Sequence, residues 1–176
     1  MRVVGFALLA LGLTGCAAHH MPIMVVTRPV ADLRAQPHTQ PLAHAHDPGE
    51  ETQLLLGEHV KVLATESGWA QVEALEQPEF SHAKKWQGYP GWVAADQLAP
   101  ASSELEPNLV VIKKWAAAWR DPYRVEQAPF RLPLGAWLHG ANLGGKLWRV
   151  FMINGHGYSF CGSGGINYWT YASHCD

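Results

Sequence analysis

The sequence predicts an all-β protein made of two small tandem barrels behind an N-terminal targeting segment. Two observations carry this prediction. Past residue 24, short runs of β-branched and aromatic residues alternate with Gly, Pro, Asn and Asp, and helical periodicity is scarce. The pattern of these runs also starts a second time beyond residue 107.

The composition excludes several classes of protein. The chain has 176 residues, of which 48% are hydrophobic and 16% are charged. These values exclude a disordered chain and a multispan membrane protein. Thirteen Lys and Arg stand against fifteen Asp and Glu, giving a formal net charge of −2. Because phosphate recognition needs a basic face, we expect no nucleic-acid partner.

Residues 1–15 are predicted to be a lipoprotein signal peptide. Arg2 gives a short basic start, and residues 3–13 form an apolar run that suits a signal but is too short to span a bilayer. The run ends at Cys16 in a Leu-Thr-Gly-Cys sequence, the pattern of a bacterial lipobox. We expect cleavage before Cys16 and acylation of its thiol, which would hold the mature chain on a membrane. The alternative is an ordinary secretory signal in which Cys16 is incidental.

The residues after the signal indicate where the protein is anchored. Residues 16–24 are predicted to be a tether, and two alanines follow Cys16 with no Asp behind it. In Gram-negative lipoproteins this pattern favours the outer membrane, so we expect a location on its periplasmic face, in the cell envelope. Export implies an oxidising compartment, in which Cys161 and Cys175 either form a disulfide or remain free thiols; their spacing does not decide between the two.

Residues 25–98 hold the first predicted barrel. Its strands are expected at residues 25–35 (interrupted at Pro29), 54–64, 69–74 and 91–93, with residues 94–98 closing the unit. Residues 36–51 contain three prolines and several histidines and are expected to form a long loop.

Residues 99–107, rich in Pro, Ser and Glu, are predicted to be a linker, and residues 108–160 are predicted to repeat the first unit as a diverged second barrel. The matching segments are Leu134-Gly135 with Leu56-Gly57, residues 148–150 with 69–72, Gly157-Tyr158 with Gly91-Trp92, and residues 120–122 with 34–37. Residues 161–176 are Gly-rich and unpatterned. We expect an atypical tail there, which is either a divergent closure of the second barrel or the product of a truncated reading frame.

Four segments of the first unit resemble bacterial SH3-like domains: residues 29–34, residues 51–58, Trp69 and residues 88–93. More narrowly, they are similar to the SH3-like region in front of the NlpC-type cysteine peptidase domain in γ-D-glutamyl-L-diamino-acid endopeptidases, also called dipeptidyl-peptidase VI. The resemblance covers residues 25–98 well and residues 108–158 more loosely. It implies two tandem SH3-like barrels that act at the cell wall.

The resemblance also implies a ligand-binding site. In those enzymes the first SH3-like domain helps to wall off the substrate pocket and contacts the free amino end of a cell-wall peptide. Carried over by motif, Glu51 would offer a carboxylate to an ammonium group, Tyr89 a hydroxyl, and Trp92 an apolar platform. The alternative roles are structural: Trp69 and Trp92 as barrel core, Glu51 as a solvated loop end, and Tyr89 as the residue that shapes the turn before Pro90.

Residues 76–87 form an insertion that has no counterpart in the second unit. Loops added to a rigid barrel are common binding sites, so Phe80 and Trp86 are candidates for stacking on a sugar or a peptide. The alternative is that these two aromatic side chains only pin the loop down.

No catalytic residue, metal or cofactor is expected. A cysteine nucleophile needs a lowered pKa and a base within reach, whereas Cys161 lacks the preceding Asp of the family motif and only fifteen residues follow it. His38, His44, His46 and Asp47 are metal-ligand residue types, as are His19 and His20 beside Cys16. Their spacing matches no metal motif, so a polar, proline-rich loop explains them better.

The sequence therefore predicts a lipid-anchored cell-envelope protein that binds peptidoglycan stem peptides without catalysis, alone or beside a separate cell-wall hydrolase. Two alternatives stay open. One is a truncated or partner-dependent γ-D-glutamyl-L-diamino-acid endopeptidase. The other is an envelope adaptor that binds a protein partner through an exposed barrel edge.

Overall fold

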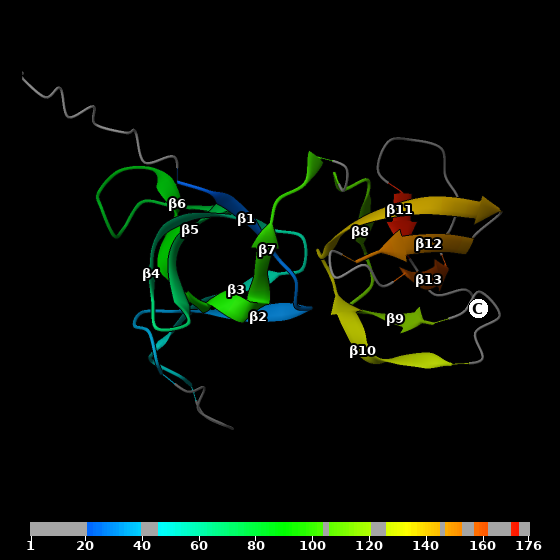
Figure 1. Cartoon of the computed structure of the whole chain (residues 1–176), viewed down its shortest axis with the longest axis horizontal. Coiled ribbons are helices and arrows are strands. Elements are labelled where there is room, and N and C mark those ends of the chain that lie inside the picture. The colour runs from blue at the N-terminus through cyan, green and yellow to red at the C-terminus, as the bar shows by residue number, and fades with distance from the viewer. Residues whose placement is uncertain are drawn as a thin grey trace, which may run out of the picture.

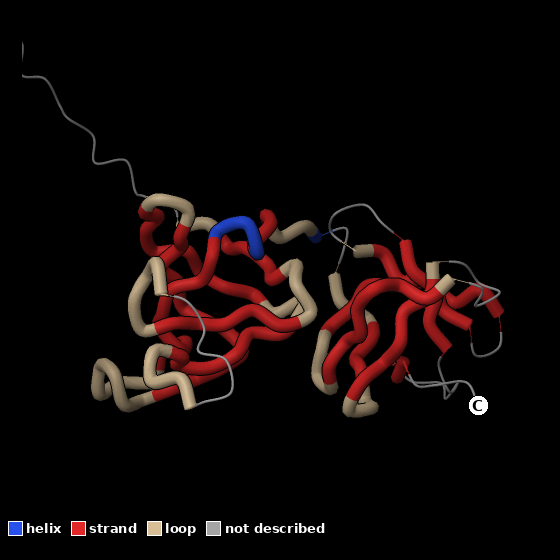
Figure 2. Tube along the Cα trace, turned by 90° about the horizontal axis from the view of Figure 1, so that it is seen from below, coloured by secondary structure: helices blue, strands red, loops and turns tan. Residues whose placement is uncertain are grey.

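The computed structural model describes residues 21–39, 46–103, 106–120, 126–144, 147–152, 157–161 and 170–172. The predicted all-β fold is confirmed: two strongly curved seven-stranded sheets form two SH3-like barrels that lie side by side (Figures 1 and 2). Within these ranges, no helix is long and apolar enough to cross a membrane. The predicted signal peptide and Cys16 lie outside the described residues.

The first barrel contains β1 (Ile23–Val26), β2 (Val30–Arg34), β3 (Glu50–Leu55), β4 (His59–Glu66), β5 (Trp69–Glu79), β6 (Gln87–Ala94), the short 3-10 helix η1 (Ala95–Gln97) and β7 (Leu98–Pro100). The strands are ordered β3-β2-β6-β5-β4-β1-β7 in the sheet. Alternate side chains of these strands point inward, where fully buried aliphatic residues such as Leu33, Leu54, Val72 and Val93 form the core.

The second barrel contains β8 (Leu109–Val111), β9 (Trp115–Trp119), β10 (Gln127–Pro133), β11 (Trp137–Gly144), β12 (Leu147–Phe151), β13 (Gly157–Cys161) and β14 (Thr170–Ala172). The sheet order is β10-β9-β13-β12-β11-β8-β14, which repeats the first order strand for strand. One pairing differs, because β14 runs parallel to β8 whereas β7 runs antiparallel to β1. The predicted internal repeat is therefore visible in the topology of the described strands.

The structure corrects the elements predicted for the first barrel in three places. The strand predicted over residues 54–64 is two strands, because the chain turns at Gly57, whose φ is +88°. The loop predicted over residues 36–51 ends at β3, which already begins at Glu50. The insertion of residues 76–87 is partly strand, since β5 continues to Glu79 and β6 begins at Gln87, and residues 80–86 form the loop between them.

Strands also extend into the predicted linker and the predicted tail. Ala99 and Pro100 of the predicted linker belong to β7 and pair with β1. Thr170–Ala172 in the predicted tail form β14 and pair with β8. In sheet order, β14 holds the position in the second barrel that β7 holds in the first.

One turn of the first barrel joins it to the second. Leu56 is 4% exposed and packs in the core cluster of the second barrel. Its carbonyl oxygen accepts a hydrogen bond of 2.8 Å from the backbone N–H of Trp137. A Cβ on Gly57 would lie 2.4 Å from the carbonyl oxygen of Trp137, so only glycine fits at this contact. The two barrels therefore meet at a tightly packed, hydrogen-bonded turn.

Candidate functional site

Two β-bulges position the residues predicted to bind a ligand. The register of β2 and β3 shifts between Thr52 and Glu50, which makes Glu51 an extra residue in β3. In the β5–β6 pair the register shifts between Gly88 and Tyr89, where residues 75–77 of β5 have no partner in β6. A bulge bends its strand and changes the direction of a side chain, and bulges are common next to functional sites.

Glu51 and Tyr89 are brought together at these bulges. Tyr89 Oη donates a hydrogen bond of 3.1 Å to Glu51 Oε2, across 38 residues of sequence. Burial raises the pKa of Tyr89, and the hydrogen bond to Glu51 and its negative charge raise it further. The Tyr89 hydroxyl is therefore a protonated donor at neutral pH. The carboxylate and the hydroxyl implied by the family resemblance thus form one site.

A second carboxylate organises the loop that follows β5. Glu79 is 7% exposed, and its side chain accepts hydrogen bonds from the backbone N–H of His82 (3.0 Å), Ser81 Oγ (3.0 Å) and Gln87 Nε2 (2.8 Å). Burial by itself raises the pKa of Glu79. The bonds from His82, Gln87 and Ser81 outweigh burial and lower this pKa to about 2.

His82 lies between the two carboxylates. Its Nδ1 is 3.1 Å from Glu79 Oε2, and its Nε2 is 3.5 Å from Glu51 Oε2. The imidazole also packs edge-on against Tyr89, with ring centroids 5.3 Å apart. We call Glu51, Glu79, His82 and Tyr89 the carboxylate cluster. Two carboxylates at a half-buried site favour a ligand group that is positively charged and donates hydrogen bonds.

An exposed aromatic pair stands beside the carboxylate cluster. Phe80 and Trp86 have ring centroids 5.7 Å apart and are 48% and 74% exposed. Both belong to the loop between β5 and β6, which projects from the end of the first barrel that faces away from the second (Figure 1). The pair offers an open apolar surface near the cluster, since Phe80 directly follows Glu79.

Trp92 is not part of this cluster, and the prediction that Trp69 and Trp92 form the barrel core is wrong. The neighbouring residues Ala70 and Val93 fill the core instead, and are 2% and 0% exposed. Side chains alternate along a strand, so both tryptophans point to the outer face, where Trp92 lies opposite Gln71. Both rings are only half-buried.

The outer face carries a buried ion pair that fixes the end of the loop before β3. Arg34 Nη1 lies 2.9 Å from Asp47 Oδ2, and the two side chains are 3% and 7% exposed. Asp47 Oδ1 also accepts a hydrogen bond from the backbone N–H of Gly49. Asp47, considered above as a metal-ligand residue type, is thus a partner of Arg34.

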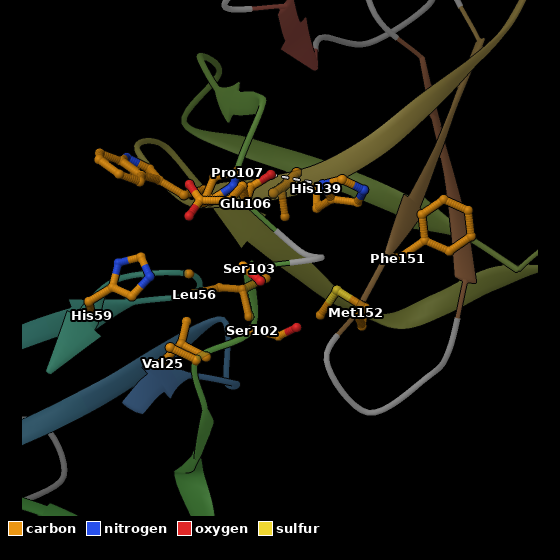
Figure 3. Close-up of a pocket in the computed structure, with 14 residues that line it drawn as sticks. Val25, Leu56, His59, Ser102, Ser103, Glu106, Pro107, His139, Phe151 and Met152 are labelled. Atoms are coloured by element: carbon orange, nitrogen blue, oxygen red, sulfur yellow. Dashed lines mark hydrogen bonds between the residues drawn. The ribbon is translucent and has the colours of Figure 1, made fainter. Parts of the chain in front are cut away.

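A half-open cavity of about 160 Å³ lies at the seam between the barrels (Figure 3). Figure 3 shows Leu56 and His59 of the first barrel on one side of the cavity, and Glu106 beside His139 of the second barrel on another. His59 Nδ1 is 2.9 Å from Glu76 Oε1, and His139 Nδ1 is 2.8 Å from the backbone oxygen of Glu106. This cavity contains none of the residues predicted to bind a ligand.

Several predicted residues lie outside the described ranges, namely Cys16, His19, His20, His44 and Cys175. Cys161 is the last residue of β13. Because Cys175 lies outside the described ranges, the choice between a Cys161–Cys175 disulfide and two free thiols stays open. Among the residues described, no three His, Cys, Asp or Glu side chains gather in a way that would hold a metal ion.

Sequence reasoning did not find Glu79 and His82, although both lie in the insertion. The hydrophobic pattern gives no sign that Glu79 is buried, because a lone Glu in a polar segment reads as a solvated residue. The one available signal was the length of the insertion between β5 and β6, because a long insertion between two paired strands needs residues that fix its fold.

Residues 33–77 match the model of the bacterial dipeptidyl-peptidase SH3 domain family. Among solved structures, the chain is similar to an NlpC/P60 family protein from Bacillus cereus, with 20% identity and a TM-score of 0.63. The match covers 79% of this chain and 54% of that protein, so the chain spans about half of its length. This likeness shows a shared fold. A search of curated proteins found no match.

Two further solved structures, NlpC2 and NlpC1 from Trichomonas vaginalis, align with 17% and 15% identity. Each alignment covers 78% of this chain, and 45% and 43% of the respective protein. Their TM-scores are both 0.28, too low to support an argument about this chain.

Proposed function

We propose, on the premise that residues 33–77 form a bacterial dipeptidyl-peptidase SH3 domain, that this chain binds the peptide stem of peptidoglycan at the carboxylate cluster. The single observation that carries the proposal is the contact between Glu51 and Tyr89. A domain of this family supports a role in cell-wall binding in general, and the cluster supplies a specific place for it.

The chemistry of the carboxylate cluster fits the free amino end of a short peptide. An ammonium group is positively charged and donates hydrogen bonds, and Glu51 offers a half-buried carboxylate to it. Tyr89 fixes one oxygen of Glu51 from the other side, so the carboxylate is oriented before the ligand arrives. The exposed Phe80–Trp86 pair gives the rest of the peptide an apolar surface.

In this proposal the chain holds the peptide but does not cut it, and Cys16 anchors the protein by acylation on the periplasmic face of the outer membrane. The support for binding without cleavage is that none of the four residues of the carboxylate cluster is a cysteine, the nucleophile of the peptidases that the sequence resembles. A separate cell-wall hydrolase is then the natural partner. Mass spectrometry of the mature protein tests the acylation and decides between a Cys161–Cys175 disulfide and two free thiols.

A second candidate function is that of a partner-dependent γ-D-glutamyl-L-diamino-acid endopeptidase. The observation in its favour is the shared fold with an NlpC/P60 family protein of which this chain spans about half. Release of L-Ala-γ-D-Glu from a stem peptide by the isolated chain, lost in the variant Cys161→Ser, would overturn binding without cleavage.

Calorimetric titration with the tripeptide L-Ala-γ-D-Glu-L-Lys tests the binding site. The variant Glu51→Gln should weaken binding about tenfold or more, because a charge-assisted hydrogen bond contributes about 1.5–3 kcal/mol. Tyr89→Phe removes the hydroxyl that orients Glu51 and should weaken binding about fivefold. The matched control is Glu66→Gln, an exposed carboxylate at the end of β4, which should leave the affinity unchanged.

Acetylation of the peptide gives an independent check of the same contact. The tripeptide acetylated at its alanine has lost the α-ammonium group and keeps only the lysine ε-ammonium, so Glu51→Gln should weaken its binding much less than it weakens binding of the free tripeptide. If the acetylated and free peptides bind wild type with the same affinity, Glu51 does not recognise an amino end and the site assignment fails.

A further inference from the structure

The two barrels carry opposite charges. Residues 25–98 contain five Lys and Arg against ten Asp and Glu, whereas residues 108–160 contain seven Lys and Arg against two Asp and Glu. The formal net charges are thus −5 and +5, although the whole chain is near neutral. The total charge of −2 conceals a strongly basic second half, which can be attracted to an anionic surface.

Both barrels also contain the sequence Lys-Lys-Trp in an exposed position. In the first barrel it is Lys84-Lys85-Trp86, in the loop that follows Glu79. In the second it is Lys113-Lys114-Trp115, at the junction of β8 and β9. The first copy is part of an acidic barrel, and the second is part of a basic one. The molecule therefore contains its own matched control for the effect of these three residues.

The second copy belongs to a larger surface patch. We define the basic–apolar patch as the exposed residues Ile112, Lys113, Lys114, Trp115, Arg131 and Leu134. Its three apolar side chains are 42%, 46% and 56% exposed for Ile112, Trp115 and Leu134. The backbone N–H of Leu134 donates to the carbonyl of Lys114 (3.2 Å), which holds the two parts of the patch side by side.

The strand register places Arg131 on the same face as Trp115. Trp115 lies opposite Pro133 and Ala117 lies opposite Arg131, while Ala116 and Leu132 point into the core. Across the described part of the chain, no carboxylate forms an ion pair with Lys113, Lys114 or Arg131. The patch thus combines three positive charges with an aromatic and two aliphatic side chains.

The repeat provides a comparison for the apolar part of this patch. Leu134 is the counterpart of Leu56, because each precedes the positive-φ glycine of the same turn. The second barrel covers Leu56, which is 4% exposed, but the described residues do not cover Leu134, which is 56% exposed. Exposed apolar side chains rimmed by polar residues mark interaction surfaces more often than chance contacts.

We propose that the basic–apolar patch docks on the surface of a lipid bilayer that contains anionic phospholipids. Lys and Arg are attracted to anionic headgroups, while Trp, Ile and Leu enter the interface between headgroups and acyl chains. The charge of the second barrel is complementary to such a surface, and the exposed tryptophan is the residue type that membrane interfaces favour. Docking would hold the second barrel against the membrane and is independent of the peptide site on the first barrel.

Vesicle sedimentation of the full chain carrying Cys16→Ser, which no acyl chain can anchor, tests this proposal. The probes are vesicles of phosphatidylcholine alone and vesicles that also contain phosphatidylglycerol. We expect the chain to bind the anionic vesicles much more tightly. The double variant Lys113→Gln/Lys114→Gln should weaken that binding about 25-fold, because each lysine near an anionic surface contributes about fivefold.

The matched control is Lys84→Gln/Lys85→Gln, which removes the same two charges from the first copy of the motif and should change binding less than twofold. Trp115→Ala should weaken binding to anionic vesicles, and Trp86→Ala should not. The proposal is overturned if both vesicle types bind equally, or if the two double variants have the same effect. It is also overturned if the patch retains an anionic cell-wall polymer but not the vesicles. Retention of the tripeptide by the vesicle-deficient variant would show that the peptide site stands independently.

Discussion

Each barrel has an arginine at the end of its second strand that pairs with a carboxylate, and the surroundings of the two pairs differ. Arg34 and Asp47 lie 2.9 Å apart with side chains that are 3% and 7% exposed. Arg120 and Glu126 also lie 2.9 Å apart, but their side chains are 51% and 68% exposed. The two pairs therefore contribute differently to stability at the same contact distance. Removing the carboxylate leaves an unpaired charge, which destabilises the fold much more when it is buried than when it is exposed.

The turn that begins the fourth strand of each barrel gives a second comparison. In both turns the glycine N–H donates to the last residue of the first strand, which is Val26 in one barrel and Val111 in the other. Both glycines have a positive φ, +88° for Gly57 and +89° for Gly135. What differs is the neighbour: Gly57 faces the backbone of Trp137, and Gly135 faces only the side chain of Leu55. The same turn therefore makes a tight backbone contact between the barrels at Gly57, and only a side-chain contact at Gly135.

The largest expected effect separates the two ion pairs. Asp47→Ala leaves the buried guanidinium of Arg34 without its carboxylate and should lower the free energy of unfolding by about 3–5 kcal/mol. Glu126→Ala in the exposed pair should cost about 0.2–1 kcal/mol. Urea unfolding of both variants measures the difference. Equal losses in the free energy of unfolding would show that burial of the Arg34–Asp47 pair does not increase its contribution to stability.

The next effect concerns the two turn glycines. Gly57→Ala should cost about 3 kcal/mol, because it combines a left-handed backbone with a clash against the Trp137 carbonyl. Gly135→Ala meets only the end of a flexible leucine, 3.1 Å away, and should cost about 1–2 kcal/mol. Gly68→Ala is the control for backbone strain alone, since nothing lies within 4 Å of its Cβ. Thermal unfolding that ranks Gly135→Ala at or above Gly57→Ala would contradict the interface geometry.

A smaller effect depends on pH and is confined to the first barrel. The pKa of Glu79 is lowered to about 2 in the folded state, from 4.5 ordinarily. The ionised form therefore stabilises the fold fully above pH 4.5, and this contribution is lost as the pH falls from about 4.5 to about 2. Thermal unfolding across this range should show a steeper loss of stability in wild type than in Glu79→Gln. Parallel curves would mean that the hydrogen bonds to Glu79 do not favour its charged form.

The smallest effect on stability is expected at the exposed aromatic pair. Trp86→Ala removes a side chain that is 74% exposed and should change the free energy of unfolding by less than about 0.5 kcal/mol. The same variant should weaken binding of the tripeptide, whereas Trp119→Ala on the second barrel should not change its affinity. An affinity unchanged by Trp86→Ala would limit the peptide site to the carboxylate cluster.

Fold class and repeat could be predicted because they follow from local patterns. The alternation of Ala70, Val72 and Ala74 with polar residues marks a half-buried strand, and Leu134-Gly135 marks the second copy of the turn at Gly57. The pairing of Glu51 with Tyr89 came from the family resemblance. Nothing local to either residue indicates that a bulge in β3 turns Glu51 toward Tyr89.

The prediction of the barrel core failed where the sequence of a strand does not show which of its two faces is buried. A tryptophan in a strand reads as core, but Trp69 and Trp92 are one residue out of phase with Ala70 and Val93. A shift of one residue exchanges the two faces of a strand, and the size of the side chain does not say which face is inside. The burial of Glu79 was equally hidden, since its partners come from a loop that bends back toward it.

Leu56 also bears on how the chain is made. During synthesis the first barrel is complete before β8 is made. The Leu56 side chain is therefore exposed to solvent until the second barrel folds and packs around it. The first barrel thus supplies one residue of the core around which the second barrel folds. A second barrel made without the first would therefore have a cavity where this leucine packs.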